Sequence, residues 1–188
     1  KNNKTINIKK GVIAITGSSG FVGSKLLLAL ANHNLRLIVR SIDNKINHEQ
    51  IECDFETDNI PDDFFFGVSV VFHLAGIAHD IRDASDIEHI YRRVNVDSTL
   101  RLAKLAVRSG VKKFVFVSSV KAGGSSLSKK CISETEQEKP EGIYGETKRE
   151  AELKLLALGR ESGMHISIIR PSLVYGPDFK GNLALMFS

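Results

Sequence analysis

Tyr144 and Lys148 are the residues whose types and spacing best suit acid–base chemistry. Four residues apart on a helix, their side chains lie on one face. A tyrosine hydroxyl ionises near pH ~10, too high for a base at neutral pH, and a neighbouring cation favours the phenolate. We therefore expect Lys148 to lower the pKa of Tyr144, and Tyr144 to transfer protons. The alternative is a surface coincidence, because the spacing alone is a weak signal.

Ser119 could add a third polar group to this pair. It follows the apolar run Phe114–Val117, which reads as a buried strand. A hydroxyl at the end of that strand could bond a substrate oxygen beside Tyr144, although serine also simply ends strands well. The stretch from 118 to 143 is rich in Ser, Gly, Lys and Glu and has no periodicity. Such a long irregular segment inside a domain is usually functional or mobile.

A glycine-rich turn at residues 16–23 reads Thr-Gly-Ser-Ser-Gly-Phe-Val-Gly. It follows a predicted strand and opens a predicted helix, the context of a phosphate site. The first glycine permits a tight turn, the second a close backbone approach to a pyrophosphate, and the third close packing of helix on sheet. The candidate cofactor-binding residues here are Gly17, Ser19, Gly20, Phe21, Val22 and Gly23. A glycine-rich turn without a ligand is the alternative, and no P-loop lysine follows.

Short apolar runs alternate with helical patterns along the chain. Strands are predicted at Val12–Thr16, Leu35–Arg40, Gln50–Cys53, Val68–Leu74, Lys113–Val117 and His165–Ile169, and helices at Phe21–Asn32, Ile87–Ser109 and Tyr144–Ser162. This alternation predicts an α/β fold, a Rossmann-type doubly wound parallel sheet over residues 11–170. Ligands of such sheets bind at the carboxyl ends of the strands.

The composition is that of an ordinary soluble protein. The 188 residues are 42% hydrophobic with a net charge of +4, enough for one domain. The basic residues are dispersed, which favours solvated faces over a nucleic-acid surface. No apolar run approaches the ~18 residues of a membrane span. Cys53 and Cys131 lack metal-ligand spacing, so we expect two free thiols, no metal and a cytoplasmic location.

Taken together, the ordered motifs resemble a known family. They are the turn 16–23, Asp54-Phe55, His73-Leu74-Ala75-Gly76, Asn95, Ser119, Tyr144 with Lys148, Arg170-Pro171 and Val174–Pro177. Their order resembles the extended short-chain dehydrogenase/reductases, in the nucleotide-sugar epimerase/dehydratase branch. Within it, the runs 118–121 and 180–182 resemble a bacterial UDP-glucose 4-epimerase-like subgroup. That subgroup includes reductases of UDP-4-keto-6-deoxyhexosamines used for surface polysaccharide.

The resemblance implies an NAD(P)-dependent enzyme that moves a hydride to or from C4 of a UDP-sugar, with Ser119, Tyr144 and Lys148 as catalytic residues. Asp54 would bond the adenine amino group and Phe55 would pack on that ring, although Asp54 could merely end a strand. Further implied cofactor contacts are Leu74, Ala75, Gly76, Asn95, Tyr144, Lys148, Pro171 and Val174, and the implied substrate contacts are Ser119, Lys121 and Asn182. His73 is expected to be a core residue, and the assembly to be a homodimer.

Two departures from the family pattern qualify these expectations. Members run well past 188 residues, so we expect the C-terminal substrate domain to be largely absent, with 171–188 as its start. Arg40 stands where many members carry an acidic residue, and a guanidinium can pair with the 2′-phosphate of NADP. NADP is therefore slightly favoured over NAD. Arg40 could instead be an exposed strand end, with Asp43 binding the ribose. A non-catalytic NAD(P)-sensing regulator and an RNA-binding member of the fold are the rival functions.

Overall fold

Six parallel strands form one sheet in the computed structural model, which describes residues 11–57, 60–78, 84–124, 133–134 and 137–177. Their order across the sheet is β3-β2-β1-β4-β5-β6. The strands are β1 (Val12–Thr16), β2 (Leu35–Val39), β3 (Glu49–Glu52), β4 (Val68–His73), β5 (Lys113–Val117) and β6 (His165–Ile169). The predicted α/β fold class, a Rossmann-type parallel sheet, is confirmed.

The chain builds the sheet outward from its centre in two directions. It runs from β1 to β3, returns to place β4 beside β1, and then adds β5 and β6. All neighbouring strands are parallel, so every carboxyl end lies at the same edge of the sheet. The reversal between β1 and β4 is the point where ligands of such sheets bind.

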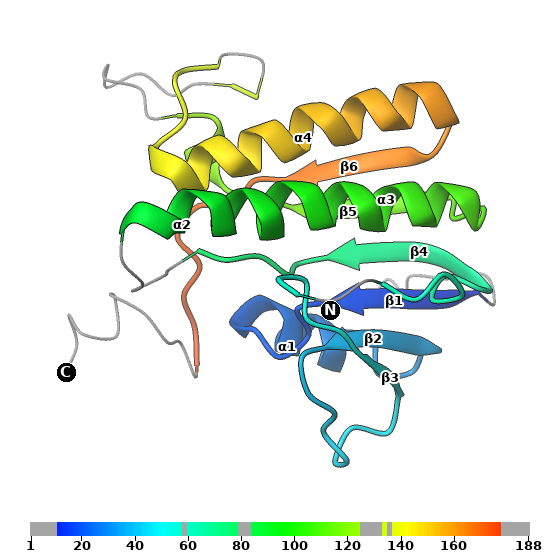
Figure 1. Cartoon of the computed structure of the whole chain (residues 1–188). Helices are drawn as coiled ribbons and strands as arrows, with labels where there is room; N and C mark the ends of the chain where they lie inside the picture. The colour runs from blue at the N-terminus through cyan, green and yellow to red at the C-terminus, as the bar shows by residue number, and fades with distance from the viewer. Residues whose placement is uncertain (1–10, 58–59, 79–83, 125–132, 135–136, 178–188) are drawn as a thin grey trace.

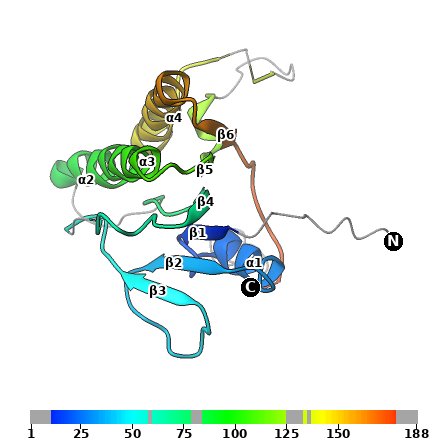
Figure 2. The same ribbon diagram turned by 90° about the vertical axis from the view of Figure 1, so that its right-hand side faces the viewer.

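Helices cover both faces of the sheet (Figures 1 and 2). The helix α1 (Phe21–Ala29) lies on one face. The other face carries α2 (Ala84–Tyr91), a π-helical segment η1 (Arg92–Ser98), α3 (Thr99–Arg108) and α4 (Gly142–Ser162). A larger apolar core, with Phe114, Phe116 and Leu155 among its members, lies under α3 and α4, and a smaller one lies under α1.

All three predicted helices differ in detail, and α4 begins at Gly142, two residues before its predicted start. The helix predicted to reach Asn32 ends at Ala29, because a tight turn, closed by a 2.9 Å hydrogen bond from the backbone N–H of His33 to the carbonyl of Leu30, leads into β2. The predicted helix Ile87–Ser109 contains the π-helical segment η1, which its apolar spacing did not reveal. The strands end within one residue of their predicted positions.

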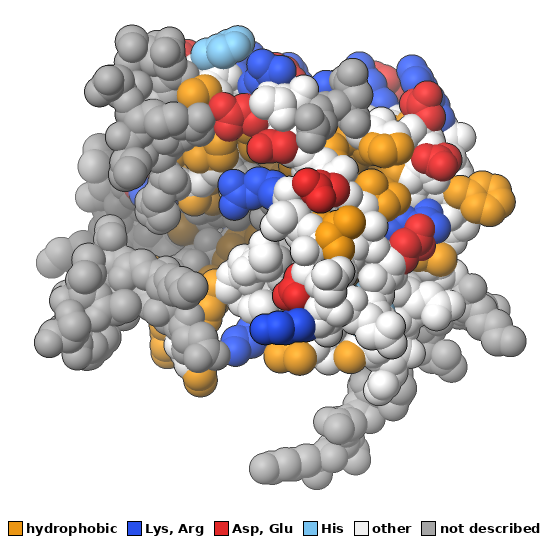
Figure 3. All heavy atoms as spheres, turned by 60° about the horizontal axis from the view of Figure 1, so that its bottom comes forward, with side chains coloured by type: hydrophobic (Ala, Val, Ile, Leu, Met, Phe, Trp, Pro, Cys, Tyr) orange, Lys and Arg blue, Asp and Glu red, His pale blue; other side chains and the backbone are white. Residues whose placement is uncertain are grey.

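On the face shown in Figure 3, acidic and basic side chains of the described residues are interspersed with apolar ones. Across the described ranges, no helix combines the length and the apolar character that crossing a membrane requires. The same ranges hold no cluster of His, Cys, Asp and Glu that could bind a metal ion.

Candidate dinucleotide-binding and catalytic site

The glycine turn between β1 and α1 is packed too tightly for side chains at two of its glycines. Gly17 has a φ of +73°, and a Cβ there would lie 2.7 Å from the backbone nitrogen of Ala75. A Cβ on Gly23 would lie 2.0 Å from the carbonyl oxygen of Gly17. The predicted roles of these two glycines in the turn and in helix packing are thus confirmed.

Gly20 is less constrained, because among the described residues a Cβ there would meet the Gly17 oxygen at 3.3 Å, a tight contact but not a severe clash. Gly20 is the N-cap residue of α1. The backbone N–H groups that follow an N-cap have no partner within the helix and can bind an anion. In the same turn, the Ser18 hydroxyl is buried and has no hydrogen-bond partner among the described residues. A helix start and a buried hydroxyl without a described partner fit a phosphate-binding turn.

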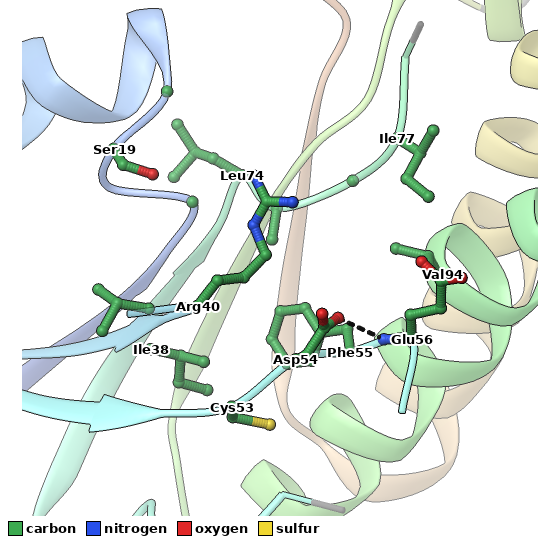
Figure 4. Close-up of a pocket in the computed structure, with 15 residues that line it drawn as sticks. Ser19, Ile38, Arg40, Cys53, Asp54, Phe55, Glu56, Leu74, Ile77 and Val94 are labelled. Carbon is green, nitrogen blue, oxygen red and sulfur yellow. Dashed lines mark hydrogen bonds between the residues drawn. The ribbon is translucent and has the colours of Figure 1, made fainter. Parts of the chain in front are cut away.

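A cavity of about 240 Å³ opens beside this turn, at the carboxyl edge of the sheet (Figure 4). Nine residues predicted to bind the cofactor line it: Gly17, Ser19, Gly20, Arg40, Asp54, Phe55, Leu74, Ala75 and Gly76. They come from the ends of β1, β2, β3 and β4, which the parallel topology brings together. The Arg40 side chain, exposed at the end of β2, extends across the cavity toward Leu74.

Asp54 and Phe55 lie together on one side of the cavity (Figure 4). The Asp54 carboxylate accepts a 2.9 Å hydrogen bond from the backbone N–H of Glu56, which holds the turn after β3. The Phe55 ring is 8% exposed and packs edge-on against His73, with 6.0 Å between the ring centroids. Both side chains can therefore line a site for a flat ring, while also shaping the turn.

His73 connects three elements below the cavity. Its Nδ1 lies 2.7 Å from the Thr16 hydroxyl oxygen, and its Nε2 lies 2.8 Å from the hydroxyl oxygen of Thr99 in α3. The Thr16 oxygen also accepts a 3.2 Å bond from the backbone N–H of Ala75. Burial lowers the pKa of His73 to about 3, with a smaller contribution from the Lys148 charge. The ring is therefore neutral at pH 7, and the prediction of a core histidine is confirmed.

Asn95 shapes the cavity through the backbone of a neighbouring loop. Its Oδ1 accepts from the N–H of Ile77 at 2.9 Å, and its Nδ2 donates to the carbonyl of Ile77 at 3.0 Å. Nδ2 also donates to the Thr147 hydroxyl at 3.3 Å. Asn95 is buried within η1, so it ties the loop after β4 to the helix that carries Tyr144. A direct contact between Asn95 and a cofactor stays a prediction.

Ser119 and Tyr144 face each other across the edge of the sheet. Ser119 precedes the short 3₁₀ helix η2 (Val120–Ala122), and its Oγ accepts a 3.3 Å bond from the N–H of Lys121. Burial raises the pKa of the Tyr144 hydroxyl, and its side-chain hydrogen bond with Ser119 opposes that rise. The expected lowering of this pKa is therefore wrong, because burial disfavours the phenolate more than the Ser119 hydrogen bond favours it.

Lys148 is buried one turn further along α4. Its ammonium donates to the carbonyl of Val117 at 3.0 Å and lies 4.6 Å from the centroid of the Phe116 ring. Burial lowers its pKa to about 8, against a smaller raising effect from Glu152. A Cβ on Gly76 would lie 3.1 Å from this ammonium, so Lys148 meets the cavity at Gly76.

Gly145 lets α4 approach the turn that carries Ser119. A Cβ at this position would lie 2.5 Å from the carbonyl oxygen of Lys121. The N–H of Glu141 donates to the same oxygen at 3.0 Å. Sequence reasoning missed Gly145; a glycine in the first turn of a predicted helix, where it weakens the helix, is the signal that could have found it.

Other predicted residues lie outside this cavity. Phe21 and Val22 begin α1, and Val22 is exposed. Lys121 is also exposed, and Asn182 lies outside the described residues. The remaining two follow β6: the carbonyl of Pro171 accepts from the N–H of Val120 at 3.1 Å, and Val174 is exposed.

The cavity also has walls that sequence reasoning missed, formed by Ile38, Val39, Cys53, Glu56, Ile77 and Val94. Five of the six are apolar, with Ile38 and Val39 in β2 and Val94 in η1. Sequence patterns predict burial for such residues equally well in a core and in a cavity wall.

Comparison with known proteins identifies the family to which the chain is similar. The NAD dependent epimerase/dehydratase family matches residues 13–186. A UDP-glucose 4-epimerase of Vibrio cholerae is 38% identical over 179 residues, which are 92% of this chain and 54% of that protein. The chain spans about half the length of the curated relatives that it matches.

Solved structures agree with this match. MoeE5 in complex with UDP-glucose and NAD superposes with a TM-score of 0.78 at 31% identity, over 90% of this chain and 57% of MoeE5. The UDP-glucose 4-epimerase of Thermotoga maritima with UDP-glucose gives 0.78 at 26% identity, over 94% of this chain and 61% of that one. By its sequence and its fold, the chain belongs to the NAD dependent epimerase/dehydratase family.

Proposed function

We propose that this chain is the cofactor-binding and catalytic part of an enzyme that moves a hydride between NAD(P) and C4 of a UDP-sugar. Residues 11–170 bind the dinucleotide, and 171–188 begin a substrate-binding region. One observation carries the proposal: Tyr144 is hydrogen-bonded to Ser119, while Lys148 on the same helix face meets the cavity at Gly76. The UDP-glucose and NAD held by MoeE5 support the choice of ligands.

The cavity and the turn fit a nicotinamide dinucleotide, which when bound would supply the hydride acceptor or donor. The N–H groups at the start of α1 would bind its pyrophosphate, next to the buried Ser18 hydroxyl. Asp54 and Phe55 would hold the adenine. Arg40, which extends across the cavity, favours the 2′-phosphate of NADP, because a guanidinium binds phosphate oxygens in pairs.

The catalytic residues would act on the oxygen at C4 of the sugar. Since burial raises the pKa of Tyr144, its hydroxyl keeps its proton at neutral pH and can donate it to a C4 keto oxygen. Ser119 would donate a hydrogen bond to that oxygen and hold it beside Tyr144. In the opposite direction Tyr144 must act as the phenolate, which the ammonium of Lys148 would stabilise. An epimerase and a reductase both require these same three roles.

Two measurements test the proposal. Calorimetry on the 188-residue chain should show binding of NADPH or NADH. In the whole enzyme, turnover of UDP-sugars, followed by NMR and by the absorbance of reduced nicotinamide, should fall about 10²–10⁴-fold in Tyr144→Phe with cofactor affinity unchanged.

Glu146→Gln is the matched control, because Glu146 is an exposed residue of the same helix turn. Its turnover should equal that of the wild type. Normal turnover in Tyr144→Phe would remove Tyr144 from the mechanism. Cofactor binding without turnover of any UDP-sugar would instead indicate an NAD(P)-sensing regulatory protein.

A further inference from the structure

Glu152 is a buried carboxylate on the same face of α4 as Lys148. Its side chain is 2% exposed, and it follows Lys148 by four residues. Side chains at this spacing are neighbours on a helix. A buried carboxylate without a partner is strongly unfavourable, so Glu152 must bind a cation or another donor. Lys148 is one such cation within its reach.

Arg170, directly after β6, binds Glu152 instead. Its Nε donates to Oε1 of Glu152 at 2.8 Å, and its Nη2 pairs with Oε2. Its Nη1 donates to Oε1 of Gln137 at 3.1 Å. A Cβ on Gly123 would lie 3.2 Å from Nη1, so the guanidinium also packs closely against the end of η2. Two parallel bonds to one carboxylate fix the orientation of both groups.

The ammonium of Lys148 consequently points elsewhere, to the carbonyl of Val117 at the end of β5. Within the part of the chain that the structure describes, three titratable groups face it: Tyr144 and Glu152 from α4, and the neutral His73 from β4. Among these, Glu152 is the one with a negative charge at pH 7. The carboxylate of Glu152 therefore attracts Lys148 more weakly when Arg170 binds it than when it is unpaired.

We propose that Arg170 is a positioning residue: by holding both carboxylate oxygens of Glu152, it keeps that carboxylate from capturing the ammonium of Lys148. Lys148 thus stays directed at Val117 and at the cavity beside Gly76. The consequence for turnover rests on the proposed function, whereas the effect on the charge of Lys148 does not.

Removing Arg170 should release Glu152 toward Lys148. An unpaired carboxylate one helical turn away stabilises the ammonium and draws it from the Val117 carbonyl. A close opposite charge shifts a pKa by about one unit or more. We therefore expect Arg170→Met to raise the pKa of Lys148 from about 8 by roughly one unit, a tenfold lower ratio of neutral to charged lysine.

The test is an NMR titration of the 188-residue chain labelled with ¹³C at lysine Cε. The Lys148 signal is the one lost in Lys148→Arg. Glu152→Gln should lower the pKa of Lys148, because it removes the attracting charge. In the Glu152→Gln background, Arg170→Met should raise the pKa by less than half of its effect in the wild type, since the carboxylate is gone.

Arg170→Lys is a second variant, to be used if Arg170→Met does not fold. A lysine keeps the charge but binds one oxygen at a time, so the pKa of Lys148 should rise by a smaller amount. An equal rise with and without Glu152, no change, or a fall in the pKa would overturn the proposal. The titration uses neither cofactor nor substrate, so its outcome is independent of whether UDP-sugars are turned over.

Discussion

Replacing Gly145 by alanine should separate α4 from the turn that carries Ser119. The new Cβ would lie 2.5 Å from the carbonyl oxygen of Lys121 and 3.1 Å from its carbonyl carbon. Both are backbone atoms, so no side-chain rotation can relieve the contact. The helix and the turn must move apart by about 0.5 Å to bring the closer contact to 3.0 Å.

This substitution has two opposing effects on the free energy of unfolding. Overpacking costs about 1–3 kcal/mol, whereas alanine is favoured over glycine in a helix by about 1 kcal/mol. The clash outweighs the helix propensity, and we expect a net loss of about 1 kcal/mol and a decrease in Tm of about 2–4 °C. A misplacement of about 1 Å can cost 10²-fold in rate, so half of that should cost the whole enzyme about tenfold in turnover.

The titration of Tyr144 reports the same displacement without substrate. Absorbance of the tyrosinate is followed with pH, and the difference from Tyr144→Phe isolates this residue from the other two tyrosines. A weaker Ser119 bond should raise the pKa of Tyr144 further, because that bond opposes the effect of burial. Glu146→Ala, at an exposed position of the same turn, should leave the pKa and the Tm unchanged. A higher Tm with an unchanged Tyr144 pKa in Gly145→Ala would refute the reasoning.

Three further predictions concern the cofactor side and the core. Arg40→Ala should reduce the preference for NADPH over NADH about tenfold in dissociation constants, and an equal ratio in wild type and variant would make Arg40 a surface residue. Gly23→Ala, which places a Cβ 2.0 Å from the Gly17 oxygen, should abolish dinucleotide binding measured by calorimetry; tight binding would contradict the packing described for the turn. His73 has a folded-state pKa of about 3, below its unfolded value of 6.5, so it contributes stability above pH 6.5 that is lost as the pH falls toward 3. Urea unfolding at pH 7 and pH 5 should differ by about 2 kcal/mol more in the wild type than in His73→Gln, and equal differences would show that the ring is not held neutral.

The strands, and the edge where their ends meet, could be predicted from the sequence because parallel buried strands are continuous apolar runs. Once β1 to β4 are parallel, the ends that carry Gly17, Arg40 and Asp54 must share an edge. Short-range patterns were therefore sufficient for the polar part of the cavity.

The missed features depend on contacts between distant segments. Glu152 and Arg170 are 18 residues apart, and no periodicity relates them. The pKa of Tyr144 was predicted in the wrong direction because the charge of Lys148 is visible in the sequence, whereas the burial of the hydroxyl is not. Gly145 likewise reads as a poor helix residue until the Lys121 carbonyl is placed against it.

The π-helical segment Arg92–Ser98 makes the placement of Asn95 sensitive to changes in chain length. A π-turn holds one residue more than an α-helical turn. Deleting one residue there would remove the extra residue of the π-turn and allow a continuous α-helix, with α2 and α3 still in register, but the residues within the segment would take different positions. Asn95 could then no longer hold both backbone groups of Ile77. In related sequences this segment should accept substitutions at exposed positions such as Arg93 and Asp97, yet show no single-residue gaps.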